Sequence, residues 1–176
     1  MIVAVNQVRA GECAVLSFVM SPLGRALNRD EDILSLLTKD PTKGAERLAA
    51  LEDQTREEMT SSLDGGADGV FYFLDGASPS HSTPMEYGGH FLEIDRRLLQ
   101  EFAHATFNLL YVSGKSEPYI DFVSDLPAHG FAWDQASGIT AQEVRSMRQG
   151  ALMGIEFQLE ATPEQLARLM TGKVVC

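Results

Sequence analysis

The chain has 176 residues, which is enough for one domain with a substantial core and short for two. It is 44% hydrophobic and 22% charged, an ordinary globular composition that argues against disorder. With 25 acidic against 14 basic residues the formal net charge is −11, which disfavours nucleic acid or an anionic membrane as the main partner.

The cysteine content and the hydropathy of the sequence indicate in which cellular compartment the protein is expected. The two cysteines, Cys13 and Cys176, provide neither a disulfide framework nor a zinc-binding spacing, which indicates a reducing cytosol. No apolar stretch approaches the roughly 20 residues that span a bilayer, and the N-terminal MIVAVNQVRAGE lacks the basic start of a signal peptide. We therefore expect a cytoplasmic protein.

Taken in order, short apolar strands alternate with helical patterns. The first strand is predicted at 14–20 and ends at Ser21-Pro22. A helical region follows over about 30–62, with a break near Asp40-Pro41, because proline cannot extend a preceding helix. One face of this region repeats at a spacing of three to four residues: Leu48, Leu51, Thr55 and Met59.

The segment LDGGADGVFYFLDGA, residues 63–77, joins that helix to a second strand. Gly65 and Gly66 suit the left-handed turn that closes a helix. The run 70–74 does not alternate apolar with polar residues, so it predicts a strand buried on both faces, as in parallel sheets covered by helices. Asp75 follows directly, at the strand end where parallel sheets carry their functional groups.

The same alternation continues toward the C-terminus. Further strands are predicted at 107–112, 130–133 and 151–155, with a possible sixth at 173–176. The helices are indicated by Ile94, Leu98 and Phe102, by Ser116-Glu117-Pro118, by the capping pair Thr140 and Glu143 with Val144 and Met147 facing inward, and by Thr162-Pro163. Five to six β–α units imply a parallel sheet, either an open doubly wound sheet or part of an eight-stranded barrel. No glycine-rich nucleotide motif follows any strand, and we expect no cofactor.

The segment 77–91, which contains SPSHSTPMEYGGH, is predicted to be a long loop rich in Ser, Pro and Gly. His81 and His90 lie in it and could act as acid–base groups near neutral pH. The alternative is that both are solvated loop residues. Trp133, in the fourth strand, is expected in the core.

Several motifs occur in the order and spacing of the uroporphyrinogen decarboxylase superfamily: GADGVFYF, TFNLLYVSG, GFAWD, and GALMGIEF followed by ATPEQLARL. The earlier AVLSFVMSPLGRAL and DILSLLTKDP resemble a strand of the family, the small-residue and proline loop after it, and the helix pair that follows. The chain thus resembles this superfamily beyond its first ten residues. The resemblance implies one domain over 1–176 with an α/β fold, a partial (β/α)8 TIM barrel of about half the family's length. Residues 1–12 would form an N-terminal extension or an edge strand.

The resemblance also implies a function, namely carboxy-lyase (decarboxylase) chemistry on a porphyrinogen-like or other small carboxylated substrate, as in porphyrin biosynthesis. The family's early strands, with an arginine-bearing segment and an aspartate that holds pyrrole nitrogens, and its final strand have no counterpart in this sequence. We therefore expect the chain to be incomplete as an enzyme on its own. The alternative is a non-catalytic truncated barrel that acts as a binding or assembly module.

The zinc- and cobalamin-linked methyltransferases of the superfamily are the less favoured branch. They hold zinc with a His-x-Cys motif where this chain has Tyr111-Val112-Ser113. Tyrosine and serine do not replace imidazole and thiolate as zinc ligands.

The candidate site consists of residues at the carboxyl ends of the predicted strands, where parallel barrels place their active sites. We predict catalytic roles for Asp75, Tyr111 and Asp134, and no metal. Substrate-binding roles are predicted for five further residues: Arg25, Ser113, Lys115, Glu156 and His81. The alternative is that the carboxylates only cap the following loops and helices. Two cations against three carboxylates also suit a polyanionic porphyrinogen poorly.

A partial barrel leaves strand edges open, here at 14–20 and near 173–176. Open edges pair readily with another chain. We therefore predict a homodimer joined through these edges, with a small-molecule substrate as the other partner and neither nucleic acid nor a membrane.

Overall fold

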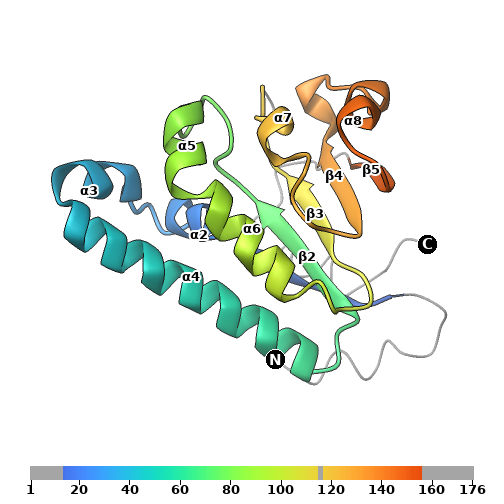
Figure 1. Cartoon of the computed structure of the whole chain (residues 1–176), viewed down its shortest axis with the longest axis horizontal. Helices are drawn as coiled ribbons and strands as arrows, with labels where there is room; N and C mark the ends of the chain where they lie inside the picture. The colour runs from blue at the N-terminus through green and yellow to red at the C-terminus, as the bar shows by residue number, and fades with distance from the viewer. Residues whose placement is uncertain (1–13, 115–116, 156–176) are drawn as a thin grey trace.

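The computed structural model describes residues 14–114 and 117–155, which fold as alternating strands and helices (Figure 1). Its strands form one parallel sheet: β1 (Leu16–Met20), β2 (Gly69–Leu74), β3 (Leu109–Val112), β4 (Gly130–Asp134) and β5 (Ala151–Ile155). Each strand pairs with the next one in sequence, in the order β1-β2-β3-β4-β5. A doubly wound sheet reverses its strand order at a switch point. The observed order is instead that of part of a TIM-barrel-like fold.

Seven helices accompany these strands within the described residues: α2 (Pro22–Leu27), α3 (Ile33–Lys39), α4 (Pro41–Asp64), α5 (Pro84–His90), α6 (Leu92–Glu101), α7 (Ile120–Val123) and α8 (Ala141–Met147). The predicted break at Asp40-Pro41 is confirmed, because Asp40 ends α3 and its carboxylate caps α4. α4 and α6 run beside each other along one side of the sheet (Figure 1). None of the described helices is both long and apolar enough to cross a membrane.

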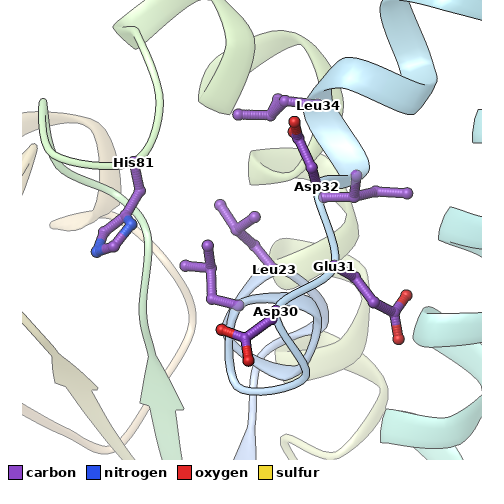
Figure 2. A pocket seen from close by; sticks show the side chains of 8 residues that line it. Leu23, Asp30, Glu31, Asp32, Leu34 and His81 are labelled. Carbon is purple, nitrogen blue, oxygen red and sulfur yellow. The ribbon is translucent and has the colours of Figure 1, made fainter.

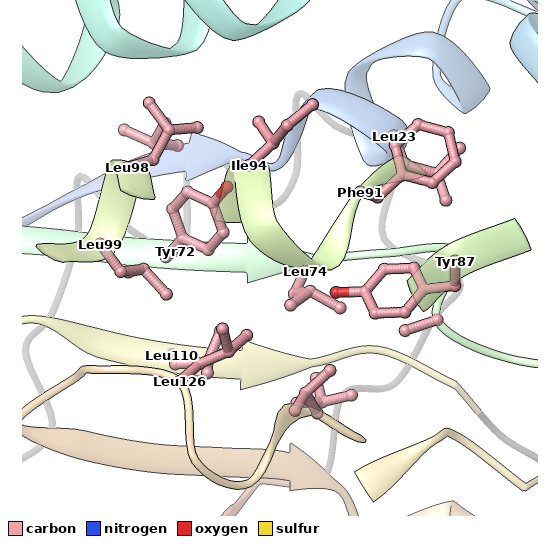
Figure 3. Close-up of a cluster of buried hydrophobic side chains, with 14 of the residues drawn as sticks. Leu23, Tyr72, Leu74, Tyr87, Phe91, Ile94, Leu98, Leu99, Leu110 and Leu126 are labelled. Carbon is pink, nitrogen blue, oxygen red and sulfur yellow. The ribbon is translucent and has the colours of Figure 1, made fainter. Parts of the chain in front are cut away.

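The two faces of the sheet pack differently. On one face, strand residues such as Tyr72, Leu74 and Leu110 pack against helix residues in the main core (Figure 3). The other face, called here the aromatic face, is built from strand residues and Phe107: Leu16, Phe18, Met20, Phe71, Phe73, Leu109, Tyr111 and Ala132. No helix within the described ranges contributes to that cluster. All six residues of β2 are buried between the two faces, which confirms the prediction for this strand.

The loop predicted over 77–91 is wrong in its second half, where residues Pro84–His90 form α5. Thr83 Oγ accepts a hydrogen bond from the Glu86 N–H, and the Glu86 carboxylate accepts one from the Thr83 N–H. This capping box, with Pro84 in the first turn, starts a helix even in a segment rich in Ser and Gly. The same signature correctly predicts α8 at Thr140 and Glu143.

Smaller differences concern the C-terminal half of the described chain. Val144 is buried as predicted, but Met147, the last residue of α8, is 47% exposed and does not face inward. The helix predicted to open at Ser116-Glu117-Pro118 begins instead at Ile120 as α7, and its buried residues are Ile120 and Val123. Trp133 is in the core as predicted, and its indole N–H donates to the Ile139 carbonyl at 2.9 Å. The predictions for 1–12, for the helix from Thr162 and for 173–176 lie outside the described residues.

Candidate functional site at the strand ends

The register of the sheet brings the carboxyl ends of β2, β3 and β4 into one row. Phe73 pairs with Tyr111, and Tyr111 pairs with Ala132. Side chains alternate along a strand, so the residues two positions further on extend the aromatic face past the strand ends. These residues are Asp75, Ser113 and Asp134. Together with Tyr111, they are the predicted site residues that the fold gathers at one place.

Asp134 is the last residue of β4 and is fully buried. Its Oδ1 accepts a hydrogen bond from the Ala136 N–H at 2.9 Å and so starts a short 3-10 turn over 135–137. Its Oδ2 is also buried and has no hydrogen-bond partner among the residues described. Because a buried polar atom without a partner is costly, this oxygen is available to a hydrogen-bond donor or a cation that enters the site.

Asp75 lies just after β2, beside the start of α2. Its Oδ1 accepts the Gly76 N–H at 2.9 Å, and its own N–H donates to Ser21 Oγ at 3.4 Å. Gly24 is packed so closely that a Cβ there would lie 3.1 Å from the Asp75 Cβ. Asp75 and Asp134 each use one oxygen in a turn, as the capping alternative expects, and each is a carboxylate with a second oxygen.

Tyr111 lies close enough to Asp75 and Asp134 for the charges of both aspartates to act on its hydroxyl. Its side chain is fully buried, and its ring stacks on Phe71 and Phe73 with centroid separations of 5.6 and 5.3 Å. Burial, and then the negative charges of Asp134 and Asp75, raise the pKa of the Tyr111 hydroxyl. Tyr111 is therefore a neutral hydrogen-bond donor near neutral pH, and both carboxylates lie close enough to act on it.

Ser113 lies in this row just after β3, where it is buried and its N–H donates to the Leu74 carbonyl at 2.9 Å. The other predicted site residues are placed elsewhere or lie outside the described residues. Arg25 reaches α4, where its guanidinium bonds to Glu58 and Thr55. His81 is exposed in the loop before α5. Lys115 and Glu156 fall in the ranges that the structure does not describe.

His81 lines a separate cavity of about 360 Å³ between its loop and the connection from α2 to α3 (Figure 2). The other lining residues are Leu23, Leu27, Asp30, Glu31, Asp32, Ile33 and Leu34. Two of the acids already have structural partners. Glu31 accepts two hydrogen bonds from Arg47, which lower its pKa, and Asp32 caps α3 through the Ser35 N–H.

The sequence interpretation missed Asp95, a carboxylate of α6 that is 1% exposed. Desolvation by burial raises its pKa to about 7, although hydrogen bonds from the Tyr72 and Tyr87 hydroxyls lower it. A signal was available in the sequence, since Asp95 stands four residues from both Phe91 and Leu99 and so falls on the apolar stripe of its helix.

Comparison with known proteins bears on the fold. No family model matches the chain, and no curated protein matches its sequence. Among solved structures, a methyltransferase from Methanosarcina mazei matches with a TM-score of 0.70 at 15% identity. The match covers 92% of this chain and 49% of that one, so this chain spans about half the length of the protein it matches. The similarity establishes the partial TIM-barrel-like architecture.

Proposed function

We propose that this chain forms part of a small-molecule site in a TIM-barrel-like protein of the uroporphyrinogen decarboxylase type. The observation that carries the proposal is the buried Oδ2 of Asp134, which lacks a partner among the described residues at the carboxyl end of β4. A ligand N–H group, such as that of a pyrrole, satisfies an oxygen of this kind through a charge-assisted hydrogen bond. Asp75, two strands away in the same row, supplies a second carboxylate.

Carboxy-lyase chemistry would use these groups in a defined way. Breaking the bond from carbon to the carboxylate releases CO2 and leaves the electron pair on carbon, which must then take up a proton. Carboxylates beside the ligand N–H stabilise the positive charge that builds up when a pyrrole ring is protonated on carbon. Tyr111, kept protonated by its raised pKa, would orient the ligand as a hydrogen-bond donor.

The test is calorimetric titration of the purified chain with porphobilinogen, a monopyrrole that carries N–H donors. Succinate, which has carboxylates but no N–H, is the control ligand. We expect porphobilinogen alone to bind, with an affinity at least tenfold weaker in Asp134→Asn and in Asp75→Asn. Equal affinities of the wild-type chain and both variants for porphobilinogen would assign the aspartates to turn capping alone.

Methyl transfer is a second candidate function, favoured by the structural similarity to the Methanosarcina mazei methyltransferase. Within residues 14–114 and 117–155, no group of three or more His, Cys, Asp or Glu side chains is placed to hold a metal ion. Native mass spectrometry of the full chain after incubation with zinc distinguishes the candidates. A tight complex with one zinc ion would favour methyl transfer over the N–H-binding site proposed above.

An assembly role is the non-catalytic alternative, and the edge of the sheet favours it. β1 pairs only with β2 among the described strands, and within these residues its other edge has no strand partner, so a strand from another chain can pair there. We propose a homodimer formed through this edge. Light scattering should give about twice the chain mass, and replacement of Phe18 by proline should give a monomer, because proline removes a strand N–H.

A further inference from the structure

Asp95 lies at a junction of three elements. From α6, its Oδ1 accepts a hydrogen bond from the Tyr72 hydroxyl of β2 at 2.6 Å, and its Oδ2 accepts one from the Tyr87 hydroxyl of α5 at 2.8 Å. The hydroxyls of Tyr72 and Tyr87 lie within the apolar layer between the helices and the sheet (Figure 3). Tyr72 and Tyr87 are both fully buried. The carboxylate is thus the polar link that joins α5 to the rest of the core.

No arginine or lysine in the described part of the chain forms an ion pair with Asp95. Its helix neighbours Arg96 and Arg97 turn outward to other carboxylates: Glu93 and Asp125 for Arg96, and Glu52 for Arg97. Glu52, from α4, adds a negative charge that disfavours ionisation of Asp95. Arg25 of α2 acts on Tyr72 from a distance, and its guanidinium is paired with Glu58. The two tyrosine hydroxyls partly compensate an ionised Asp95, but no cation of the described residues accompanies them, and burial of the carboxyl group outweighs these hydrogen bonds.

We propose that Asp95 is a pH-responsive clasp: its neutral carboxyl group, which accepts from one tyrosine hydroxyl and donates its own proton to the other, holds α5 against β2 and α6. Its ionisation favours an open arrangement in which α5 moves away and the carboxylate contacts water. α5 is the element that moves, because it has only seven residues while β2 lies inside the sheet. The proposal does not depend on the ligand site at the strand ends.

Movement of α5 would also displace the loop over 76–83, which connects α5 to Asp75. Ser82, one residue before the cap of α5, donates its hydroxyl to the Gly76 carbonyl at 2.7 Å, and its own carbonyl accepts the Tyr119 hydroxyl at 2.6 Å. His81 precedes Ser82 and lines the 360 Å³ cavity. Opening of the clasp therefore rearranges this cavity.

Hydrogen exchange of the α5 amides tests the clasp. Base-catalysed exchange accelerates about tenfold per pH unit at every amide. If opening also releases one proton, the open population rises by up to about tenfold per unit below the Asp95 titration. We therefore expect exchange in α5 to rise by up to about hundredfold per pH unit between pH 5 and 7, and about tenfold above pH 7. In Asp95→Asn the slope should be about tenfold throughout.

Three controls separate the clasp from other titrations. Asp125→Asn removes an exposed carboxylate that pairs with α6 and should keep the steep slope, as should His90→Gln and His81→Gln. Loss of the steep slope in either histidine variant, or its persistence in Asp95→Asn, overturns the proposal. Should Asp95→Asn fail to fold, carbon NMR of the wild-type carboxyl group decides instead. A midpoint near pH 7 supports the clasp, and one near 4 refutes it.

Discussion

Asp95 and Asp134 are both buried carboxylates, but they differ in how their oxygens are hydrogen-bonded. Asp95 sits in the helix layer with both oxygens bonded to tyrosine hydroxyls. Asp134 sits at a strand end with one oxygen in a turn and the other without a partner among the described residues. A buried carboxylate that the protein satisfies by itself belongs to the structure. One that it leaves half satisfied is where a ligand can gain binding energy.

The largest expected effect is on the pH dependence of stability, and it belongs to Asp95. Its pKa is about 7 in the folded protein against an ordinary value near 4 when unfolded. Stability from this group is fully present below about pH 4 and is lost as pH rises to about 7, a loss of about 4 kcal/mol. Urea unfolding of the wild type and of Asp95→Asn from pH 4 to 8 measures it.

The difference between the wild type and Asp95→Asn is the informative quantity, because other carboxylates titrate in the opposite sense. Glu31, Glu86 and Glu143 have lowered pKa values, which their hydrogen bonds cause. Both proteins share these groups. If the difference in unfolding free energy between the two proteins stays constant from pH 4 to 8, folding does not disfavour ionisation of Asp95. The proposed difference between Asp95 and Asp134 would then not hold.

The second prediction breaks one of the two tyrosine links. Tyr87→Phe removes the hydrogen-bond partner of Asp95 Oδ2, which should cost about 1–3 kcal/mol of unfolding free energy at pH 5, where α5 is held closed. Tyr119→Phe is the matched control, because its hydroxyl donates to a neutral carbonyl in a loop and should cost about 1 kcal/mol or less. Thermal unfolding of both variants gives the comparison. Equal losses of unfolding free energy in the two variants would mean that the hydrogen bond from Tyr87 to Asp95 stabilises the fold no more than an ordinary hydrogen bond does.

The sequence predicted the framework of the described sheet well, since all five strands and the helix face from Leu48 to Met59 follow from apolar spacing. Asp75, Ser113 and Asp134 could be placed at one end because parallel strands share a direction. The contacts that give Asp95 its role could not be predicted, because they depend on which tyrosines from β2 and α5 reach the same helix. Arg25 was predicted to lie at the strand ends. The residues around it in the sequence do not indicate that its guanidinium pairs with Glu58 on α4.

The third prediction concerns the turn that Asp134 caps. Asp134→Ala removes the hydrogen bond to the Ala136 N–H and should cost about 0.5–2 kcal/mol, the usual value of a lost cap. Asp75→Ala should cost a similar amount through the Gly76 N–H. Chemical denaturation measures both. A loss for Asp134→Ala well above this range would mean that its second oxygen has a structural partner after all.

The smallest expected change in stability, and the most informative one about function, comes from Asp134→Asn. The amide oxygen can still accept the Ala136 N–H, and the uncharged side chain is easier to bury, so unfolding free energy should change by less than about 1 kcal/mol. The affinity for an N–H ligand should nevertheless fall by at least tenfold, because the carboxylate charge is lost. In Asp95→Asn the pattern should be reversed, with a changed pH dependence of stability and unchanged ligand affinity. If both variants lose affinity equally, the helix layer and the strand ends act as one site, and the two buried carboxylates differ only in their partners.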